Sequence, residues 1–185
     1  RTAIKMTEDL KSRLAKVRLL LMDVDGVLTN GKLYQVPAPD GTMVETKGFD
    51  STDGLGLMWL ATNGIQTGVI SGRNSPATIE RAKQVKLSYV YQGHLEKIPI
   101  LNEITAKSGI ARDQIAYVGD DLTDVVVMRR VGVGIAVANA RPEVKSVAHY
   151  ITHAPGGSGA IREVAEKILQ AQGHWTAILK KYEVE

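Results

Sequence analysis

The apolar run Leu19–Met22 stops at Asp23-Val-Asp25-Gly26, and no other feature of the chain constrains its fold as strongly. An unbroken apolar run of strand length that ends in polar residues and glycine is typical of a buried parallel strand. Asp23 and Asp25 would lie at its carboxyl end, where open α/β sheets place their ligands. Residues two positions apart in an extended segment point the same way, and Gly26 permits a sharp turn after them. The purely structural alternative is that these aspartates cap the next helix.

The rest of the chain continues this pattern, because apolar segments of strand length alternate with segments of helical spacing. The sequence predicts strands at residues 65–70, 87–91, 115–118, 133–137 and 150–151. It predicts helices at residues 5–16, 54–62, 75–85, 95–107, 121–130, 141–147, 159–171 and 174–182. Strands that alternate with such helices form βαβ units. We therefore expect an α/β fold, a doubly wound, Rossmann-like and mostly parallel sheet with helices on both faces, in one domain of residues 1–185.

Two short segments, Lys32–Val36 and Thr42–Phe49, flank the turn Pro37-Ala-Pro-Asp-Gly41. Strand-like segments around a Pro/Gly turn predict a β-hairpin. We expect a polar hairpin that projects from the body as an insert at residues 32–48. A C-terminal tail follows at residues 173–185, where Trp175 is a candidate for a contact between subunits.

Composition narrows the function classes. The chain has no cysteine, which excludes disulfides, Cys–zinc sites, iron–sulfur clusters and thiol catalysis. Its 23 basic residues are scattered among 20 acidic ones, which argues against a nucleic-acid-binding stripe. Apolar stretches are too short to cross a bilayer, and the N-terminus lacks a secretory core. We expect a cytoplasmic protein with no nucleic-acid or membrane partner, and a small anionic substrate suits it.

A second acidic motif, Gly119-Asp120-Asp121-x-x-Asp124, ends another predicted strand. Together with Asp23 and Asp25 it places five carboxylates at two strand ends of one sheet. Their mutual repulsion requires a divalent cation, and hard oxygen ligands suit Mg²⁺. The structural alternative is one capping aspartate and a solvated helix face.

Two further residues suit phosphate chemistry. Ser71 ends a predicted strand, so its hydroxyl could bind a phosphate oxygen together with backbone N–H groups. Lys97 lies near the start of a predicted helix, where the helix dipole disfavours a cation, so another interaction should hold it. Together these features would perform phosphoryl transfer. A metal-bound carboxylate would attack phosphorus, and a second carboxylate would protonate the leaving oxygen. Ser71 and Lys97 would bind the phosphoryl oxygens.

The motifs Asp23-Val-Asp25, Ser71, Lys97 and Gly119-Asp-Asp-x-x-Asp124, in this order, resemble those of the haloacid dehalogenase superfamily of phosphatases. Within it, the chain resembles the 3-deoxy-D-manno-octulosonate 8-phosphate phosphatase group over about residues 17–172. The matching stretches are 23–31, 71–73, 91–93, 116–122 and 156–163. This resemblance implies a Mg²⁺-dependent phosphatase of a sugar-acid phosphate, active in lipopolysaccharide or other cell-surface polysaccharide synthesis.

The resemblance also implies roles for the motif residues. Asp23 would be the nucleophile that forms an aspartyl-phosphate, and Asp25 the general acid and then the base. Ser71 and Lys97 would hold the phosphoryl group. Mg²⁺ would be bound by Asp23, the backbone carbonyl of Asp25, and Asp120. The residues behind these ligands would be Asp121 and Asp124.

The same resemblance marks positions that would contact the substrate. They are Asp50, Ser51, Thr52, Asp53, Gly54, Gly72, Arg73 and Arg81. Thr52 stands where group members often carry arginine, and Ser158 interrupts a Gly-Gly-Arg-Gly pattern. Because both changes remove cations, a nine-carbon 2-keto sugar acid phosphate or another small phosphomonoester is an alternative substrate.

No cap domain fits between the motifs, since Asp23 and Ser71 lie only 48 positions apart and Lys97 precedes Asp120 by one helix and one strand. The resemblance to capless members of this group implies a homotetramer. In it, the hairpins of the four subunits would form a central barrel, and a neighbouring subunit would help to close each active site. The hairpin here would be Lys32–Gly48. A mobile surface flap on a monomer is the alternative.

Two other function classes share part of this pattern. A receiver-type signalling domain also places acidic residues, a hydroxyl and a lysine around a phosphorylated aspartate, but the Asp-x-Asp spacing and the extra length disfavour it. An inactive assembly module is disfavoured by Asp25. His149 and His153 have i,i+4 spacing, yet the strand predicted between them argues against a shared metal.

Overall fold

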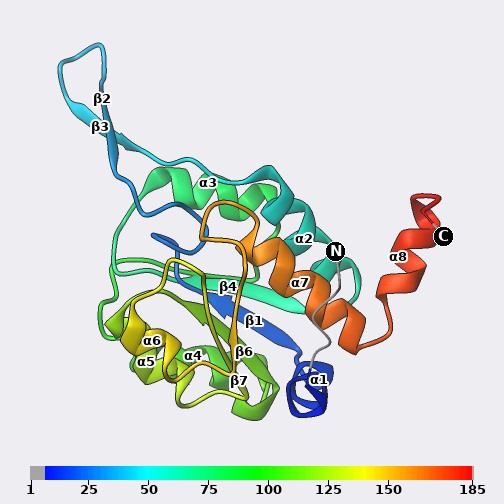
Figure 1. Cartoon of the computed structure of the whole chain (residues 1–185). Coiled ribbons are helices and arrows are strands. Elements are labelled where there is room, and N and C mark those ends of the chain that lie inside the picture. The colour runs from blue at the N-terminus through cyan, green and yellow to red at the C-terminus, as the bar shows by residue number, and fades with distance from the viewer. Residues whose placement is uncertain (1–6, 185) are drawn as a thin grey trace.

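The computed structural model describes residues 7–184, and its centre is a parallel sheet of six strands (Figure 1). The strand order β5-β4-β1-β6-β7-β8 places β1 in the middle, between β4 and β6. The strands are β1 (Leu19–Met22), β4 (Gln66–Ile70), β5 (Tyr89–Tyr91), β6 (Ile115–Gly119), β7 (Val133–Ala136) and β8 (Tyr150–Ile151). A strand with neighbours on both sides and helices on both faces must be apolar throughout, which explains the run Leu19–Met22.

Helices cover the two faces of this sheet. α2 and α7 pack against each other on one face, and α4 and α5 pack together on the other (Figure 1). The helices are α1 (Glu8–Ala15), α2 (Ser51–Thr62), α3 (Pro76–Gln84), α4 (Lys97–Ser108), α5 (Leu122–Met128), α6 (Pro142–Lys145), α7 (Ala160–Ala171) and α8 (Trp175–Lys181), with the 3-10 turn η1 (Arg112–Gln114). The predicted doubly wound α/β fold is confirmed.

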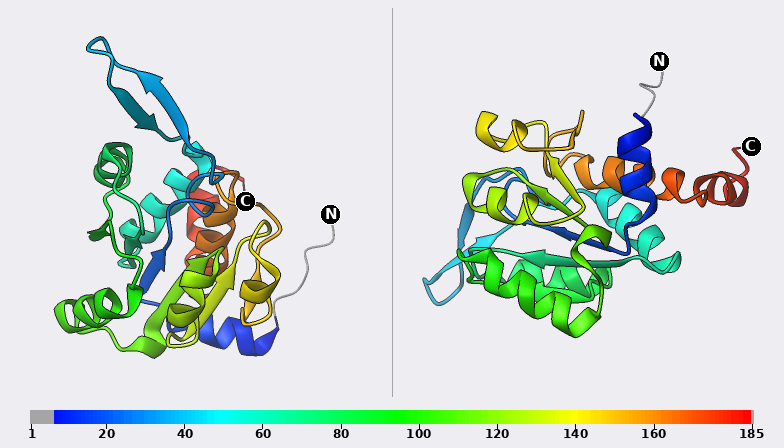
Figure 2. Two further views of the ribbon diagram at one scale, coloured as in Figure 1. Left: turned by 90° about the vertical axis from the view of Figure 1, so that its left-hand side faces the viewer. Right: turned by 90° about the horizontal axis from the view of Figure 1, so that it is seen from below.

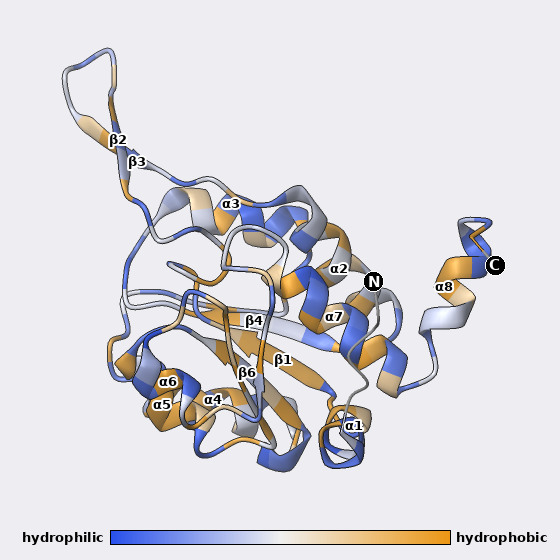
Figure 3. Ribbon diagram, viewed as in Figure 1, coloured by the Kyte–Doolittle hydropathy of each residue, from blue (hydrophilic) through white to orange (hydrophobic). Residues whose placement is uncertain are grey.

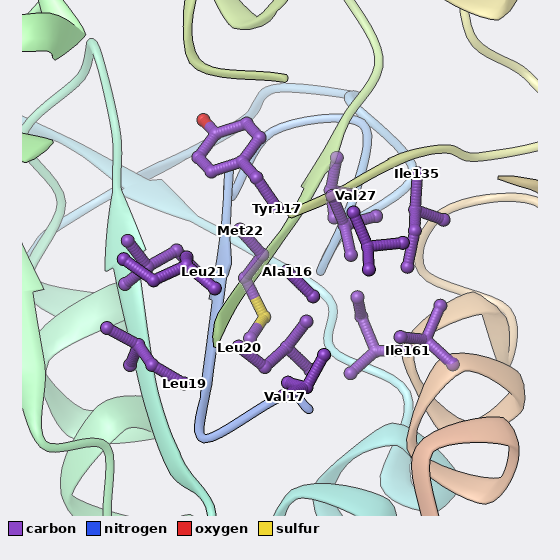
Figure 4. Close-up of a cluster of buried hydrophobic side chains, with 14 of the residues drawn as sticks. Val17, Leu19, Leu20, Leu21, Met22, Val27, Ala116, Tyr117, Ile135 and Ile161 are labelled. Carbon is purple, nitrogen blue, oxygen red and sulfur yellow. The ribbon is translucent and has the colours of Figure 1, made fainter. Parts of the chain in front are cut away.

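The core lies between the sheet and these helices, and the central strand β1 is hydrophobic along its whole length (Figure 3). Figure 4 shows side chains of β1 in one buried cluster that also contains Ala116 and Tyr117 of β6, Ile135 of β7 and Ile161 of α7. Each large apolar side chain buried here contributes about 1.5–3 kcal/mol. This packing holds the carboxyl ends of β1 and β6 side by side.

The hairpin stands off from the body (Figures 1 and 2). β2 (Tyr34–Pro37) and β3 (Met43–Thr46) pair antiparallel, with Val36 opposite Val44. The predicted projection is confirmed, but the prediction of a polar hairpin is wrong. The exposed apolar side chains are Leu33, Tyr34, Val36, Met43 and Val44.

Some predicted boundaries shift. The helix expected at 54–62 already begins at Ser51, because Asp50 caps it by accepting the N–H of Thr52 and Asp53. The helix expected from residue 95 begins at Lys97.

Between β1 and β4 the chain carries only the hairpin and α2, and between α4 and β6 only η1, so no cap domain interrupts residues 7–184. Residues 5 and 6 of the first predicted helix lie outside the described residues. No helix among them is long and apolar enough to cross a membrane.

Candidate active site

Acidic and polar side chains meet where β1, β4 and β6 end, at one edge of the sheet. A pocket of about 230 Å³ opens there. Its lining residues are Asp23, Asp25, Ser71, Gly72, Arg73, Leu95, Asp120, Asp121 and Thr123. The predicted catalytic residues of three strand ends are therefore neighbours, as parallel topology requires.

Asp23 is the first residue after β1 and points into this pocket. Its Oδ1 accepts the N–H of Val24 at 2.7 Å, and its Oδ2 lies 3.0 Å from Nζ of Lys97. Burial raises the pKa of Asp23 to about 6, against the opposing effect of the Lys97 charge. One lysine therefore does not fully compensate the buried carboxylate, which leaves room for another cation.

Lys97 lies beneath the pocket at the first position of α4, and its side chain is only 1% exposed. Its Nζ lies 2.7 Å from Oδ1 of Asp124 and donates to the hydroxyl of Tyr117 at 3.1 Å. Burial would lower the pKa of Lys97, but the charges of Asp124 and Asp23 outweigh it and raise the pKa above its usual value. These partners explain how the lysine tolerates the positive end of the helix dipole.

Asp124 uses all of its acceptor capacity inside the protein. Oδ1 accepts from Lys97 and from the hydroxyl of Tyr117, and Oδ2 accepts the N–H of Asp120 at 3.0 Å and of Asp121 at 3.2 Å. The pKa of Tyr117 is raised well above its usual value by burial and by the Asp124 charge, so its hydroxyl stays a donor. Asp124 thus fixes the backbone that presents Asp120.

Asp120 is the carboxylate most in need of a cation. Its Oδ1 is buried without a hydrogen bond, and burial, with the charges of Asp124 and Asp23, raises its pKa to about 7. Oxygens of Asp23, Asp120 and Asp124 lie within 4.8 Å of one another. Since Asp124 is already occupied by four donors, Asp23 and Asp120 are the members of this group with acceptor capacity left for a cation.

Gly26 allows Asp120 to approach the catalytic loop. It adopts a φ of +87°, and a Cβ atom on it would lie 2.1 Å from Oδ2 of Asp120. The loop is held from the other side by Asn139, whose side chain donates to the carbonyl of Gly26 at 3.1 Å and accepts the N–H of Gly156 at 2.6 Å. Glycine is therefore required here for contact as well as conformation.

Asp25 has a partner that the sequence analysis missed. The ammonium group of Lys47, at the base of the hairpin, contacts Oδ1 of Asp25 and lies 3.2 Å from Oε1 of Glu45. The other oxygen of Glu45 accepts from Arg73 at 2.5 Å. Glu45 and Lys47 lie two positions apart, a spacing that puts both side chains on one side of an extended segment. That spacing was the available signal.

Ser71 and Arg73 occupy the turn after β4. Ser71 is 2% exposed, and its Oγ accepts the N–H of Arg73 at 3.2 Å. Arg73 is half exposed at the pocket mouth. Of the predicted substrate positions, the structure brings Gly72 and Arg73 to the pocket.

The other predicted substrate positions, residues 50–54 and Arg81, do not line this pocket. Residues 50–54 form the start of α2, and Arg81 lies on α3 beside it: Arg81 donates to the carbonyl of Asp50 at 2.8 Å, and buried Asp53 accepts the N–H of Arg162 at 2.8 Å. Thr52 bonds the Asp50 carboxylate, while Ser51 is exposed. Within one chain they hold α2 against α3 and α7, and substrate contact stays a prediction.

The remaining candidates have partners within the chain. His149 accepts the N–H of Gly134 at 3.0 Å, and His153 pairs with Glu163 at 2.9 Å, so the two histidines have separate partners. Trp175, expected at a subunit contact, packs edge-on against Trp59 of the same chain at 5.6 Å.

Comparison with known proteins agrees with this geometry. Residues 71–162 match the model of the haloacid dehalogenase-like hydrolases. The 3-deoxy-D-manno-octulosonate 8-phosphate phosphatase of Yersinia pestis is 39% identical over 90% of this chain and 87% of its own. The structure of the phosphatase of that name from Moraxella catarrhalis, in complex with magnesium, phosphate and KDO, superposes with a TM-score of 0.89 at 38% identity, over 96% of this chain and 99% of its own. The structure of a probable phosphatase from Pseudomonas syringae superposes with a TM-score of 0.88 at 43% identity, over 95% of this chain and 98% of its own.

A doubly wound sheet with Asp23, Ser71, Lys97 and Asp120 at its carboxyl edge defines a phosphatase of the haloacid dehalogenase-like class. Within that class, the chain belongs to the 3-deoxy-D-manno-octulosonate 8-phosphate phosphatase family.

Proposed function

We propose that this chain hydrolyses 3-deoxy-D-manno-octulosonate 8-phosphate with Mg²⁺, in the synthesis of lipopolysaccharide precursors. The observation that carries the proposal is the pocket in which Asp23, Asp25, Ser71 and Asp120 meet above the buried ammonium group of Lys97. Its relatives of that name cover most of its length. A cytoplasmic location and the absence of nucleic-acid or membrane partners stay predictions.

The residues of the pocket fit Mg²⁺. Asp120 has a buried oxygen without a partner, and the pKa values of Asp23 and Asp120 are raised by burial and by neighbouring carboxylates. Hard carboxylate oxygens suit this ion. Asp23, Asp120 and the backbone carbonyl of Asp25 would hold it, with Asp124 behind them and Asp121 at the start of α5. When bound, Mg²⁺ supplies charge neutralisation for the phosphoryl oxygens and the carboxylates.

The reaction then proceeds in two displacements. A carboxylate oxygen of Asp23 attacks phosphorus, the bond from phosphorus to the sugar oxygen breaks, and the sugar oxygen takes a proton from Asp25. Water next attacks the aspartyl-phosphate and gives a proton to Asp25, which releases phosphate and restores Asp23. Ser71 binds a phosphoryl oxygen from one side. Lys97 stabilises the charge that develops beneath it.

The apolar hairpin supports a homotetramer. Tyr34, Val36 and Val44 share one face of it, because opposed residues of an antiparallel pair point the same way. Each of the three is exposed by 44% or more, so this face needs a cover. Packing of four such faces would cover it and would bring a neighbour to each pocket.

Measurement of kcat/KM on a panel of phosphates tests the proposal. The octulosonate 8-phosphate should exceed a nine-carbon 2-keto sugar acid phosphate and p-nitrophenyl phosphate, EDTA should abolish turnover, and Asp23→Asn should be inactive. A preference for the nine-carbon acid would overturn the substrate but not the reaction. Absence of turnover on every phosphate would overturn both, and would favour the inactive module.

A further inference from the structure

Lys47 is a buried cation that the reaction above does not use. It follows β3, in the limb that joins the projecting hairpin to α2, yet its side chain is only 1% exposed. A buried ammonium group is costly unless it is paired. Both partners of Lys47 are acidic: Asp25, which follows β1, and Glu45 of the hairpin.

The contacts of Lys47 separate the two oxygens of the Asp25 carboxylate. Lys47 donates to Oδ1, whereas no residue between 7 and 184 donates a hydrogen bond to Oδ2. Asp25 lines the pocket and Lys47 does not. Lys47 is therefore placed to act on Asp25 rather than on a bound phosphate.

Glu45 fixes Lys47 in turn. Its Oε1 lies 3.2 Å from the ammonium group, and its Oε2 accepts from Arg73 at 2.5 Å. Burial would raise the pKa of Glu45, but its bonds to Arg73 and Lys47 outweigh burial and lower it, so this carboxylate stays charged. Arg73, Glu45, Lys47 and Asp25 form one chain of alternating charges from the end of β4 to the end of β1.

We propose that Lys47 is a positioning residue that holds Oδ1 of Asp25, so that Oδ2 alone exchanges the proton with the leaving oxygen and with water. The proposal rests on the acid–base role of Asp25 in the proposed function. An ammonium group that donates to Oδ1 can do so in both protonation states of Asp25, because the acid carries its proton on Oδ2. It follows that the base of the hairpin belongs to the catalytic site of its own chain.

Leaving-group dependence tests this role. Since kcat/KM reports the step in which the leaving group departs, Lys47→Met should affect good leaving groups little and poor ones strongly. We expect a loss of under about threefold on p-nitrophenyl phosphate and of roughly ten- to hundredfold on phenyl phosphate and the sugar phosphate, which is less than the roughly hundred- to ten-thousandfold that a general acid contributes in full. Lys47→Arg should restore part of the loss. A merely structural role would lower all three equally and would overturn the proposal.

Two controls separate the possible failures. Lys32→Met removes an exposed lysine from the other limb of the hairpin and should change nothing. In an Asp25→Asn background, Lys47→Met should add no further leaving-group dependence, because both changes remove one function. If Asp25→Asn itself leaves that dependence unchanged, the acid–base assignment fails. If Asp25→Asn steepens it and Lys47→Met does not, only the role of Lys47 fails. Circular dichroism and thermal unfolding confirm that each variant is folded.

Discussion

Nζ of Lys97 lies 2.7 Å from Oδ1 of Asp124 and 3.0 Å from Oδ2 of Asp23, so one buried ammonium group joins α4, α5 and the end of β1. Lys97→Met would leave two carboxylates without their cation. We expect the free energy of unfolding without Mg²⁺ to fall by about 3 kcal/mol, as for other buried pairs that lose one partner. Phosphatase activity should be lost as well. Urea unfolding measures the first effect.

Lys83→Met is the matched control for Lys97→Met. Lys83 also pairs with a carboxylate at 2.7 Å, that of Glu80, but both side chains are about two-thirds exposed. Exposed pairs contribute little, so the change in stability should stay under about 1 kcal/mol. Equal effects of the two substitutions would contradict a special role for the buried ammonium group.

The acidic pair Asp23 and Asp120 should make the metal-free protein less stable as pH rises. Their folded pKa values, about 6 and about 7, lie above the value of about 3.9 for unfolded aspartate. The folded state therefore binds more protons than the unfolded state between about pH 4 and pH 7. The contribution of the pair to stability is complete below about pH 4 and is lost as pH rises through 6 and 7.

Mg²⁺ should reverse that loss, because it binds the deprotonated carboxylates. At a hundred times its Kd, a ligand adds about 2.7 kcal/mol. For a chain of 185 residues this is a rise in Tm of roughly 5–10 °C. We expect that rise at pH 7.5 and a clearly smaller one at pH 5.5, by differential scanning calorimetry. In Asp120→Asn, Mg²⁺ should not raise Tm at either pH. Equal rises in Tm at pH 7.5 and pH 5.5 in the unchanged protein would refute the coupling of Mg²⁺ binding to deprotonation.

Gly26→Ala should disrupt the metal site through contact. The new Cβ would meet Oδ2 of Asp120 at 2.1 Å, in addition to the strain of a φ near +87°. Gly41→Ala is the matched control, since Gly41 has a φ of +84° at the hairpin tip but no atom within 4 Å of the new Cβ. Both variants should lose about 1–2 kcal/mol of stability from backbone strain. Only Gly26→Ala should weaken Mg²⁺ binding by calorimetric titration. Equal Mg²⁺ affinity in the two variants would mean that Asp120 can move aside freely.

The carboxyl ends of β1 and β6 could be predicted from the sequence because their signal is local. An apolar run that stops at Asp23 or at Gly119 marks the strand end directly, and parallel topology does the rest. Lys97 was also predictable, since its conflict with the helix dipole indicated an unseen partner. Which partners these are, Asp124 and Tyr117, depends on packing between α4, α5 and β6.

Residues whose signal is not local were missed. Glu45 and Lys47 have the spacing of a solvated strand face, and only the tertiary fold brings them to Asp25 and Arg73. Asp50 carries the local signal of a helix N-cap, which the prediction of a helix from residue 54 did not use, and its contact with substrate stays a prediction. The structure shows the capping bonds, and these explain why α2 begins three residues before the expected position.

Val36→Asp tests the proposed tetramer. It places a charge in the middle of the apolar hairpin face, opposite Val44 and close to Tyr34. If four such faces pack together, the variant should elute as a folded monomer, and the unchanged protein as a tetramer. Size exclusion with light scattering gives both masses. Thr42→Asp adds the same charge near the tip and should remain tetrameric. If the unchanged protein is itself a monomer, the predicted tetramer is wrong, and no neighbouring subunit lies at each pocket.

Arg73 and Arg81 were both predicted to contact the substrate, and the structure separates them. Arg73 lies at the pocket mouth, where we expect it to bind the carboxylate of a sugar acid, whereas Arg81 donates to the carbonyl of Asp50 beside α2. Arg73→Ala should raise KM for the sugar-acid phosphate about tenfold or more, as for the loss of a charged hydrogen bond, and barely change KM for p-nitrophenyl phosphate. Because Arg81 bonds Asp50 within its own chain, Arg81→Ala should lower the free energy of unfolding. It should change KM for the two substrates equally. If Arg81→Ala instead raises KM for the sugar acid alone and only in the tetramer, Arg81 reaches a neighbour's pocket. If Arg73→Ala affects both substrates equally, Arg73 binds the phosphoryl group that they share, and the carboxylate needs another partner.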